Sequence, residues 1–155
     1  MDRRGFLGAL GVASAGVALF TRDAFGAGAP LPLPPMTVYK SPSCGCCGEW
    51  VKHVKGAGFT VKVVDMDDLT RIKRDAGVPP AMESCHTALV GAYVVEGHVP
   101  ADLVKKMLND KPKIAGLAVP GMVVGSPGME QGNEKPPYNV MAFMKDGSTS
   151  VYARR

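Results

Sequence analysis

The stretch SPSCGCCGEW, residues 41–50, contains three cysteines within four consecutive positions. This cluster constrains the fold more than any other feature of the sequence. The segment before it, residues 36–41, is short and β-prone, with Val38 and Tyr39 near its centre. Apolar side chains then recur at the spacing of one helical face, at Cys47, Trp50, Val51 and Val54. The sequence therefore predicts a strand followed by a helix, with a Cys-x-x-Cys at their junction.

The chain that follows alternates between strand and helix signals. Residues 59–68 alternate apolar and polar side chains and predict a second strand, and a second helix follows and ends before Gly77. Residues 87–90 and 93–97 predict a β-hairpin, and Pro100 suits the first turn of a third helix. The predicted order is β-α-β-α-β-β-α.

Beyond this core, a stretch rich in glycine and proline, residues 117–139, predicts a long loop. Residues 140–155 predict two strands joined at Asp146 and Gly147. The order of the core elements, with a Cys-x-x-Cys at the first strand-to-helix junction, resembles the thioredoxin and glutaredoxin architecture. The expected fold class is therefore α/β, a thioredoxin-like β-α-β-α-β-β-α core with an added C-terminal loop and β-hairpin.

The fourth cysteine, Cys85, lies far from the others in the sequence, beside His86 in the stretch SCHTALVGAYVVEG. In the thioredoxin architecture, the loop before the third strand packs against the Cys-x-x-Cys and normally ends in a cis-proline. Aligning the stretch with that loop puts Cys85 and His86 in place of the proline. We therefore expect the sulfur of Cys85 to face the other three.

Four converging thiols favour metal binding over disulfide exchange. A disulfide enzyme needs an attacking thiolate and one partner, and two further thiols would scramble the pair. One tetrahedral zinc ion suits two Cys-x-x-Cys pairs, but Cys46 and Cys47 are adjacent, and adjacent side chains on a helix point in different directions. Thiolates that bridge neighbouring ions suit this spacing better, and soft copper(I) accepts such ligands. The spacing favours a polynuclear Cu(I)-thiolate site.

Two other interpretations of the cysteines stay open at this point. Cys44 and Cys47 could serve a thiol-disulfide oxidoreductase. The cysteines could also form two structural disulfides, for instance Cys44 with Cys47 and Cys46 with Cys85. The sequence contains no Ser-His-Asp set, phosphate loop or paired-carboxylate site, so a metal-binding protein is favoured over an enzyme, with copper or thiol redox activity left open.

Three stretches together resemble a known family: SPSCGCCGEW, VPPAMESCHTALVGAYVVEGHVP and GLAVPGMVVGSPGME. It consists of small exported bacterial metal-binding proteins of thioredoxin-like fold that are associated with copper resistance, originally described as a domain of unknown function. The resemblance extends from about Val38 to Glu130. It implies copper held by cysteines, which in this sequence are Cys44, Cys46, Cys47 and Cys85.

Histidines and methionines supply further candidate ligands. His86 is a candidate because it adjoins Cys85, whereas His98, before a proline, is a weaker candidate. Met122 and Met129 lie in the glycine-rich loop, and a thioether is a good Cu(I) ligand. They could approach copper, cover the site against water, or simply pack under the loop.

The first 27 residues predict a cleavable export signal. Arg3 and Arg4 precede a mildly apolar run, residues 6–20, which is too short for a bilayer span of about 20 residues. The paired arginines resemble a twin-arginine signal, while an ordinary secretory signal or an uncleaved anchor stays open. We expect a periplasmic protein with a proline-rich lead-in at 28–36 and one thioredoxin-like metal-binding domain at 37–155.

The charges argue against nucleic acid as a partner. Of 18 basic and 14 acidic side chains, three and two lie in the leader, so the remainder carries a net charge of only about +3 and has no basic stripe. We expect no membrane association after cleavage of the signal. The expected partners are metal ions and other periplasmic copper-handling proteins.

Overall fold

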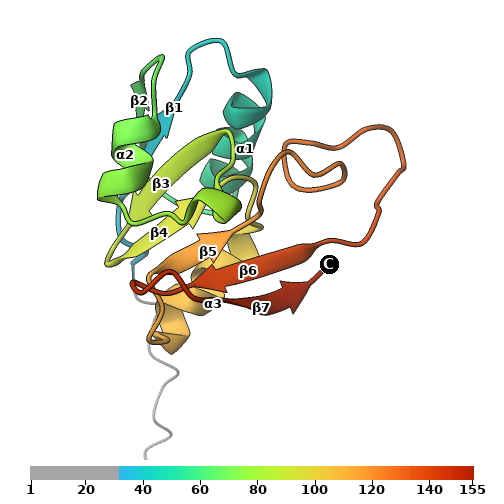
Figure 1. The fold of residues 1–155 in the computed structure, drawn as a ribbon. Coiled ribbons are helices and arrows are strands. Elements are labelled where there is room, and N and C mark those ends of the chain that lie inside the picture. Colours follow the sequence, from blue (N-terminus) through green and yellow to red (C-terminus); the bar gives the residue numbers. More distant parts are fainter. Residues whose placement is uncertain (1–31) are drawn as a thin grey trace, which may run out of the picture. The chain divides into compact units, whose positions relative to one another are not determined.

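The computed structural model describes residues 32–155, which form one compact unit (Figure 1). The predicted signal, residues 1–27, and the start of the lead-in lie outside the described residues. Within the described part, no helix has the length and apolarity needed to cross a bilayer.

The order of elements confirms the predicted core. The elements are β1 (Met36–Lys40), α1 (Gly45–Gly56), β2 (Val61–Asp65), α2 (Thr70–Asp75), the 3-10 turn η1 (Pro80–Met82), β3 (His86–Val90), β4 (Tyr93–Glu96), α3 (Ala101–Asp110), β5 (Gly116–Ala118), β6 (Asn139–Phe143) and β7 (Thr149–Arg154). Strand β5 was predicted as loop. It has three residues, begins with glycine and is buried throughout, so it shows no alternation from which a strand could be predicted.

All seven strands belong to one sheet in the order β2-β1-β3-β4-β5-β6-β7. Strand β1 runs parallel to β2 and antiparallel to β3, and β3 runs antiparallel to β4. This arrangement is consistent with the thioredoxin-like fold expected. The C-terminal hairpin, β6 and β7, extends the sheet through β5, which runs parallel to β4 (Figure 1).

Apolar clusters cover both faces of the sheet. Val94 and Val95 are neighbours on β4 and so point to opposite faces. Val95 belongs to the larger cluster, which includes the buried faces of α1 and α3, and Val94 belongs to a smaller one with Val78 and Phe143. The predicted buried face of α1 is confirmed: Cys47, Trp50, Val51 and Val54 are all buried.

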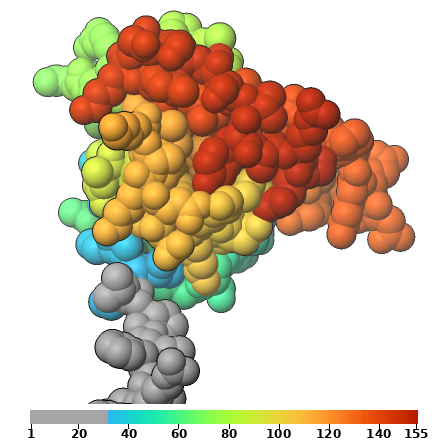
Figure 2. Space-filling model, turned by 90° about the horizontal axis from the view of Figure 1, so that it is seen from below, coloured from blue at the N-terminus to red at the C-terminus, as the bar shows by residue number. Residues whose placement is uncertain are grey.

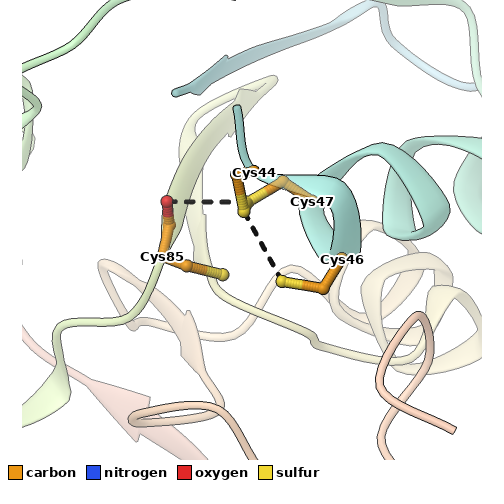
Figure 3. A group of neighbouring side chains, drawn as sticks. All are labelled: Cys44, Cys46, Cys47 and Cys85. Atoms are coloured by element: carbon orange, nitrogen blue, oxygen red, sulfur yellow. Dashed lines mark hydrogen bonds between the residues drawn. A yellow bond between two sulfur atoms is a disulfide. The ribbon is translucent and has the colours of Figure 1, made fainter. Parts of the chain in front are cut away.

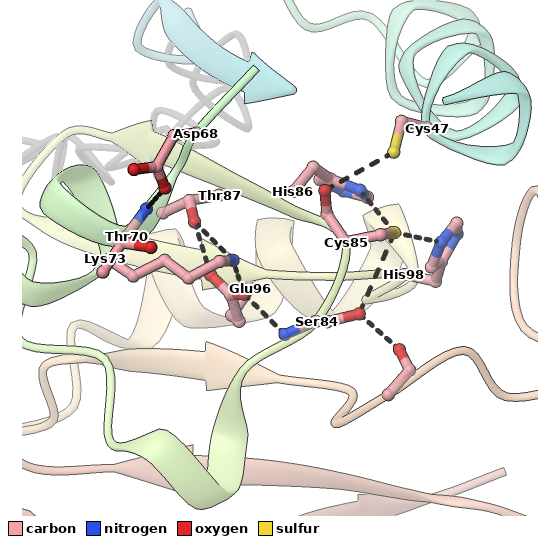
Figure 4. Close-up of polar contacts among 11 residues, drawn as sticks. Cys47, Asp68, Thr70, Lys73, Ser84, Cys85, His86, Thr87, Glu96 and His98 are labelled. Atoms are coloured by element: carbon pink, nitrogen blue, oxygen red, sulfur yellow. Dashed lines mark hydrogen bonds and ion pairs between the residues drawn. The ribbon is translucent and has the colours of Figure 1, made fainter. Parts of the chain in front are cut away.

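A buried ion pair crosses the second face of the sheet and was not predicted. The Lys73 ammonium on α2 contacts the Glu96 carboxylate on β4, and both side chains are buried (Figure 4). The Thr87 hydroxyl donates to Glu96 Oε2 at 2.7 Å, and the Ser84 backbone N–H donates to Oε1 at 2.7 Å. Burial raises the pKa of Glu96, although Lys73 and these hydrogen bonds oppose the shift. The carboxylate therefore joins α2, β3, β4 and the loop before Cys85.

Replacing Glu96 with glutamine should strongly destabilise the fold, because it leaves the Lys73 ammonium buried without its counter-charge. We expect Glu96→Gln to lower the free energy of unfolding by about 3 to 5 kcal/mol, measured by urea denaturation. Lys106 and Asp110 form an exposed i,i+4 pair, so Asp110→Asn is the matched control and should change stability little. Equal losses for the two substitutions would show that the buried ion pair stabilises the fold no more than the exposed one.

Candidate metal centre

The N-terminus of α1 carries three of the four cysteines. Cys44 is the N-cap residue, and Cys46 and Cys47 lie in the first turn, which contains no acidic residue. The unpaired N–H groups and the dipole at a helix N-terminus favour thiolate over thiol. Cys47 is fully buried against the core, whereas Cys44 and Cys46 are half-buried.

The fourth cysteine reaches this turn through the sheet. Cys85 directly precedes β3, and β3 pairs with β1 so that His86 lies opposite Lys40 at the end that leads to α1. The Sγ atoms of Cys44, Cys46, Cys47 and Cys85 all lie within 4.8 Å of one another. Figure 3 shows the Cys85 side chain pointing toward the three on α1. The expected convergence of the four sulfurs is confirmed.

The structure has one disulfide, between Cys44 and Cys47, and leaves Cys46 and Cys85 as thiols (Figure 3). It therefore contains one of the two bonds in the disulfide interpretation and not the other. Cys46 Sγ lies 3.5 Å from Cys44 Sγ. Cys47 Sγ lies 3.7 Å from the Cys85 carbonyl oxygen, a contact that becomes a thiol hydrogen bond only after reduction. All four sulfurs can act as thiolate ligands once this disulfide is reduced.

Two buried histidines flank Cys85 (Figure 4). His86 Nδ1 lies 3.4 Å from Cys85 Sγ, its ring packs 4.4 Å from that of Trp50, and its Nε2 has no hydrogen-bond partner in the described part of the chain. His98 Nε2 lies 3.0 Å from the same sulfur. The ligand atoms of Cys85, His86 and His98 form a second group, all within 4.8 Å of one another. The weaker candidate from the sequence, His98, makes the shorter contact.

The tautomer of His98 follows from its other nitrogen. His98 Nδ1 lies 2.9 Å from the carbonyl oxygen of Pro127. A carbonyl only accepts, so Nδ1 carries the hydrogen and Nε2 presents a lone pair toward Cys85. Metal-binding histidines are commonly oriented by such a bond.

Burial holds the metal-free site neutral. It raises the pKa of the Cys85 thiol to about 11, and the nearby Cys46 adds to the shift. Burial, followed by the neighbouring His98 and Lys73, lowers the pKa of His86 well below its usual value. The pKa of His98 is lowered by burial against the opposing effect of the Pro127 carbonyl. A metal ion would therefore displace a proton from Cys85 but meet unprotonated imidazoles.

The long loop between β5 and β6 closes against this site at one point and projects beyond the sheet elsewhere (Figures 1 and 2). Gly128 has a φ of +84°, and a Cβ there would lie 2.7 Å from the Trp50 backbone nitrogen and 2.9 Å from the Cys46 carbonyl oxygen. Only glycine allows this approach. Met122 is 62% exposed and Met129 is half-buried, and their contact with copper stays a prediction.

Sequence reasoning missed three groups that hold the ligands in place: the Glu96 carboxylate, the Pro127 carbonyl and the Trp50 ring. One signal for the position of His98 was present in the predicted hairpin. Thr87 pairs with Glu96, and continuing that antiparallel register by two residues places Cys85 opposite His98.

The fold and the site define a class of protein: a thioredoxin-like α/β domain with a cysteine- and histidine-lined cluster able to bind metal. A family described as "Protein of unknown function, DUF411" matches residues 82–129, which include Cys85, His86 and His98. No curated protein matches the sequence.

Two solved structures match over most of the chain. They are forms 2 and 1 of copper resistance protein CopG, with TM-scores of 0.75 and 0.74 and identities of 42% and 41%. The matches cover 80% and 79% of this chain and 98% of each CopG chain. The chain therefore belongs to the DUF411 family, the copper-resistance-associated metal-binding family of CopG, which confirms the resemblance found in its sequence.

Substituting Gly128 should loosen the loop from the site. Gly132→Ala is the matched control, since Gly132 also has positive φ but open space around its Cα, and should lower the free energy of unfolding by about 1 kcal/mol. We expect Gly128→Ala to lower the free energy of unfolding by roughly 1 to 3 kcal/mol more than Gly132→Ala does, because the added methyl is overpacked against α1. Urea denaturation followed by the fluorescence of the single tryptophan measures both. Equal losses would contradict the close packing.

Acidification should destabilise the metal-free protein through its two buried histidines. Their pKa values are lower in the folded than in the unfolded state, so below about pH 6.5 the unfolded chain binds more protons and stability falls. His98→Gln removes one of these groups, and its stability should fall less than that of the wild type between about pH 7 and pH 5. Urea denaturation across this range tests it. Parallel profiles for the two proteins would mean that His98 does not titrate abnormally. The pKa of Glu96 is raised, so its protonation stabilises the folded state as the pH falls. Both proteins contain Glu96, so this effect cancels when their stabilities are compared.

Proposed function

We propose that this protein binds Cu(I) in the periplasm as a polynuclear cysteine-thiolate cluster and serves copper resistance or homeostasis. The observation that carries the proposal is the approach of all four Sγ atoms to within 4.8 Å of one another. The relationship to copper resistance protein CopG supports copper as the cargo. The cluster requires the Cys44–Cys47 disulfide to be reduced.

Four thiolates in so small a volume repel one another, and this repulsion favours several univalent ions over one divalent ion. Each bridging thiolate shares its charge between two ions, so more than two Cu(I) ions neutralise more of the four negative charges than one divalent ion can. Cys46 and Cys47 leave the same helical turn in different directions, which suits bridging. His86 and His98 offer neutral imidazoles beside Cys85 for ions at the edge of the cluster.

The predicted twin-arginine-type leader, residues 1–27, supports export to the periplasm. The twin-arginine route carries folded cargo, and other copper-handling proteins of that compartment would donate or accept the metal. An oxidising compartment also permits a disulfide such as that between Cys44 and Cys47. Sequestration, transfer and copper redox are all roles compatible with such a site.

The Cys44–Cys47 disulfide itself favours a second candidate function, a thiol-disulfide oxidoreductase. It joins the N-cap to the first turn of α1, where a helix dipole favours a thiolate leaving group. A substrate dithiol would be oxidised to a disulfide while Cys44 and Cys47 take up its two electrons and two protons. Such an activity needs neither Cys46 nor Cys85.

Anaerobic titration of the reduced protein with Cu(I), followed by elemental analysis, tests the proposed cluster. We expect more than one copper per chain, falling to one or none in Cys46→Ser and Cys85→Ser, because each substitution removes a bridging ligand. Ser43→Ala changes an exposed residue at the start of the same turn and is the matched control, with an unchanged copper count.

A single copper per chain in the wild type, or a full count in Cys85→Ser, would overturn the cluster. Reduction of a model disulfide distinguishes the second candidate. An oxidoreductase should lose activity in Cys44→Ser and keep it in Cys85→Ser.

A further inference from the structure

We infer that the disulfide form has a metal site of its own: Cys85, His86 and His98 bind one borderline divalent cation of the zinc class while Cys44 and Cys47 are bonded to each other. The site shares Cys85 with the proposed copper cluster, but it does not depend on that cluster. Oxidation would then change the class of ion that the protein accepts rather than end metal binding.

The three ligand atoms already stand near the separations that a zinc ion requires. Zn–S bonds of about 2.3 Å and Zn–N bonds of about 2.0 to 2.1 Å place tetrahedral ligand atoms roughly 3.3 to 3.6 Å apart. Cys85 Sγ lies 3.4 Å from His86 Nδ1 and 3.0 Å from His98 Nε2, and all three atoms lie within 4.8 Å of one another. Moving His98 Nε2 outward by roughly 0.3 to 0.6 Å would bring its separation from Cys85 Sγ into this range.

The imidazole of His98 already has the tautomer and orientation that metal binding requires. The Pro127 carbonyl holds the hydrogen on Nδ1, so the Nε2 lone pair faces Cys85 before any metal arrives. In zinc sites, the same kind of second hydrogen bond fixes the orientation of the ligating ring.

His86 carries the unexplained feature of the site. It is fully buried, and its Nε2 has no hydrogen-bond partner among residues 32–155. Leaving a buried polar atom unpaired costs about 1 to 3 kcal/mol, and a histidine kept only for packing beside Trp50 would be replaced by an apolar residue without that loss. Metal binding through the nitrogen beside Cys85 supplies a reason for an imidazole here.

The disulfide changes the donor set. It removes two of the four thiolates and leaves two, Cys46 and Cys85, for a soft polynuclear cluster. Of these two, only Cys85 belongs to the group with His86 and His98, and this set of one thiolate and two neutral imidazoles with an open fourth position is typical of zinc rather than of clustered Cu(I). Both histidines come from the sheet side of the site, so the disulfide on α1 does not involve them.

Cobalt(II) is the probe for this site, because a tetrahedral thiolate-bound Co²⁺ absorbs visible light and Zn²⁺ displaces it. The protein is oxidised with oxidised glutathione, which accepts the two electrons and two protons of Cys44 and Cys47, and two remaining thiols are verified by titration. We expect one Co²⁺ per chain with a thiolate-to-metal charge-transfer band, displaced by one equivalent of Zn²⁺. The double variant Cys44→Ser/Cys47→Ser should give the same spectrum.

Variants then assign the ligands. Cys85→Ser should abolish the charge-transfer band, and His98→Gln should weaken Zn²⁺ binding at least about 100-fold, because second-shell changes alone cost 10- to 100-fold. His53→Gln is the matched control, since His53 is exposed on α1 and its side chain accepts a hydrogen bond from the Ala101 backbone N–H, with no other side-chain partner within the described structure. It should bind Zn²⁺ as the wild type does.

The inference is overturned if the disulfide form shows no charge-transfer band, or if His98→Gln binds Zn²⁺ as tightly as His53→Gln. Cys46→Ser separates this result from the copper proposal. It should lower the copper count of the reduced protein yet keep the cobalt spectrum of the disulfide form. Loss of the spectrum in Cys46→Ser would mean that Cys46 is a ligand and that the three-residue site is wrong.

Discussion

The pairing of β3 with β1 on one side and β4 on the other positions the whole site. Cys85 directly precedes β3, so the β1 register brings it to the turn that begins α1, and the β4 register brings it opposite His98. Sheet register is specified wherever a face is buried, because a slip of one residue would turn every side chain to the wrong face. Ala88 and Val95 are fully buried. The apolar core therefore determines where the ligands meet, although it contributes no ligand itself except Cys47.

A second level of support comes from polar groups that hold the ligands without being ligands. Glu96 accepts the Ser84 backbone N–H, one residue before Cys85, and is itself held by Lys73 and Thr87. Pro127 performs the same task for His98. Buried polar groups of this kind are stable only when every member is satisfied, which makes the loop before β3 rigid on both sides. A rigid thiol between two imidazoles is a preorganised ligand set, so little ordering remains to be done when a metal binds.

The core, the fold class and the meeting of four sulfurs could be predicted, because they follow from periodicity and from one motif at one junction. The spacing of Trp50 and Val54 in the sequence indicates the buried face of α1. Other features could not, because they depend on contacts between distant segments. Nothing local marks Lys73 as buried rather than exposed on α2, since lysine is almost never buried without a partner, and that partner lies on β4. Strand β5 exists because β4 and β6 offer it hydrogen bonds, while its Gly-Leu-Ala sequence has little β-propensity of its own.

The oxidation state of one pair of residues separates the chemistries of this site. When Cys44 and Cys47 are reduced, the site offers four soft sulfur donors within 4.8 Å of one another, the set that the proposed copper cluster requires. When they form the disulfide, two sulfur donors are lost, and the two imidazoles beside Cys85 equal in number the two thiols that remain. The thiols of α1 belong to one element and the imidazoles to β3 and the segment after β4, and Cys85 lies close to both groups.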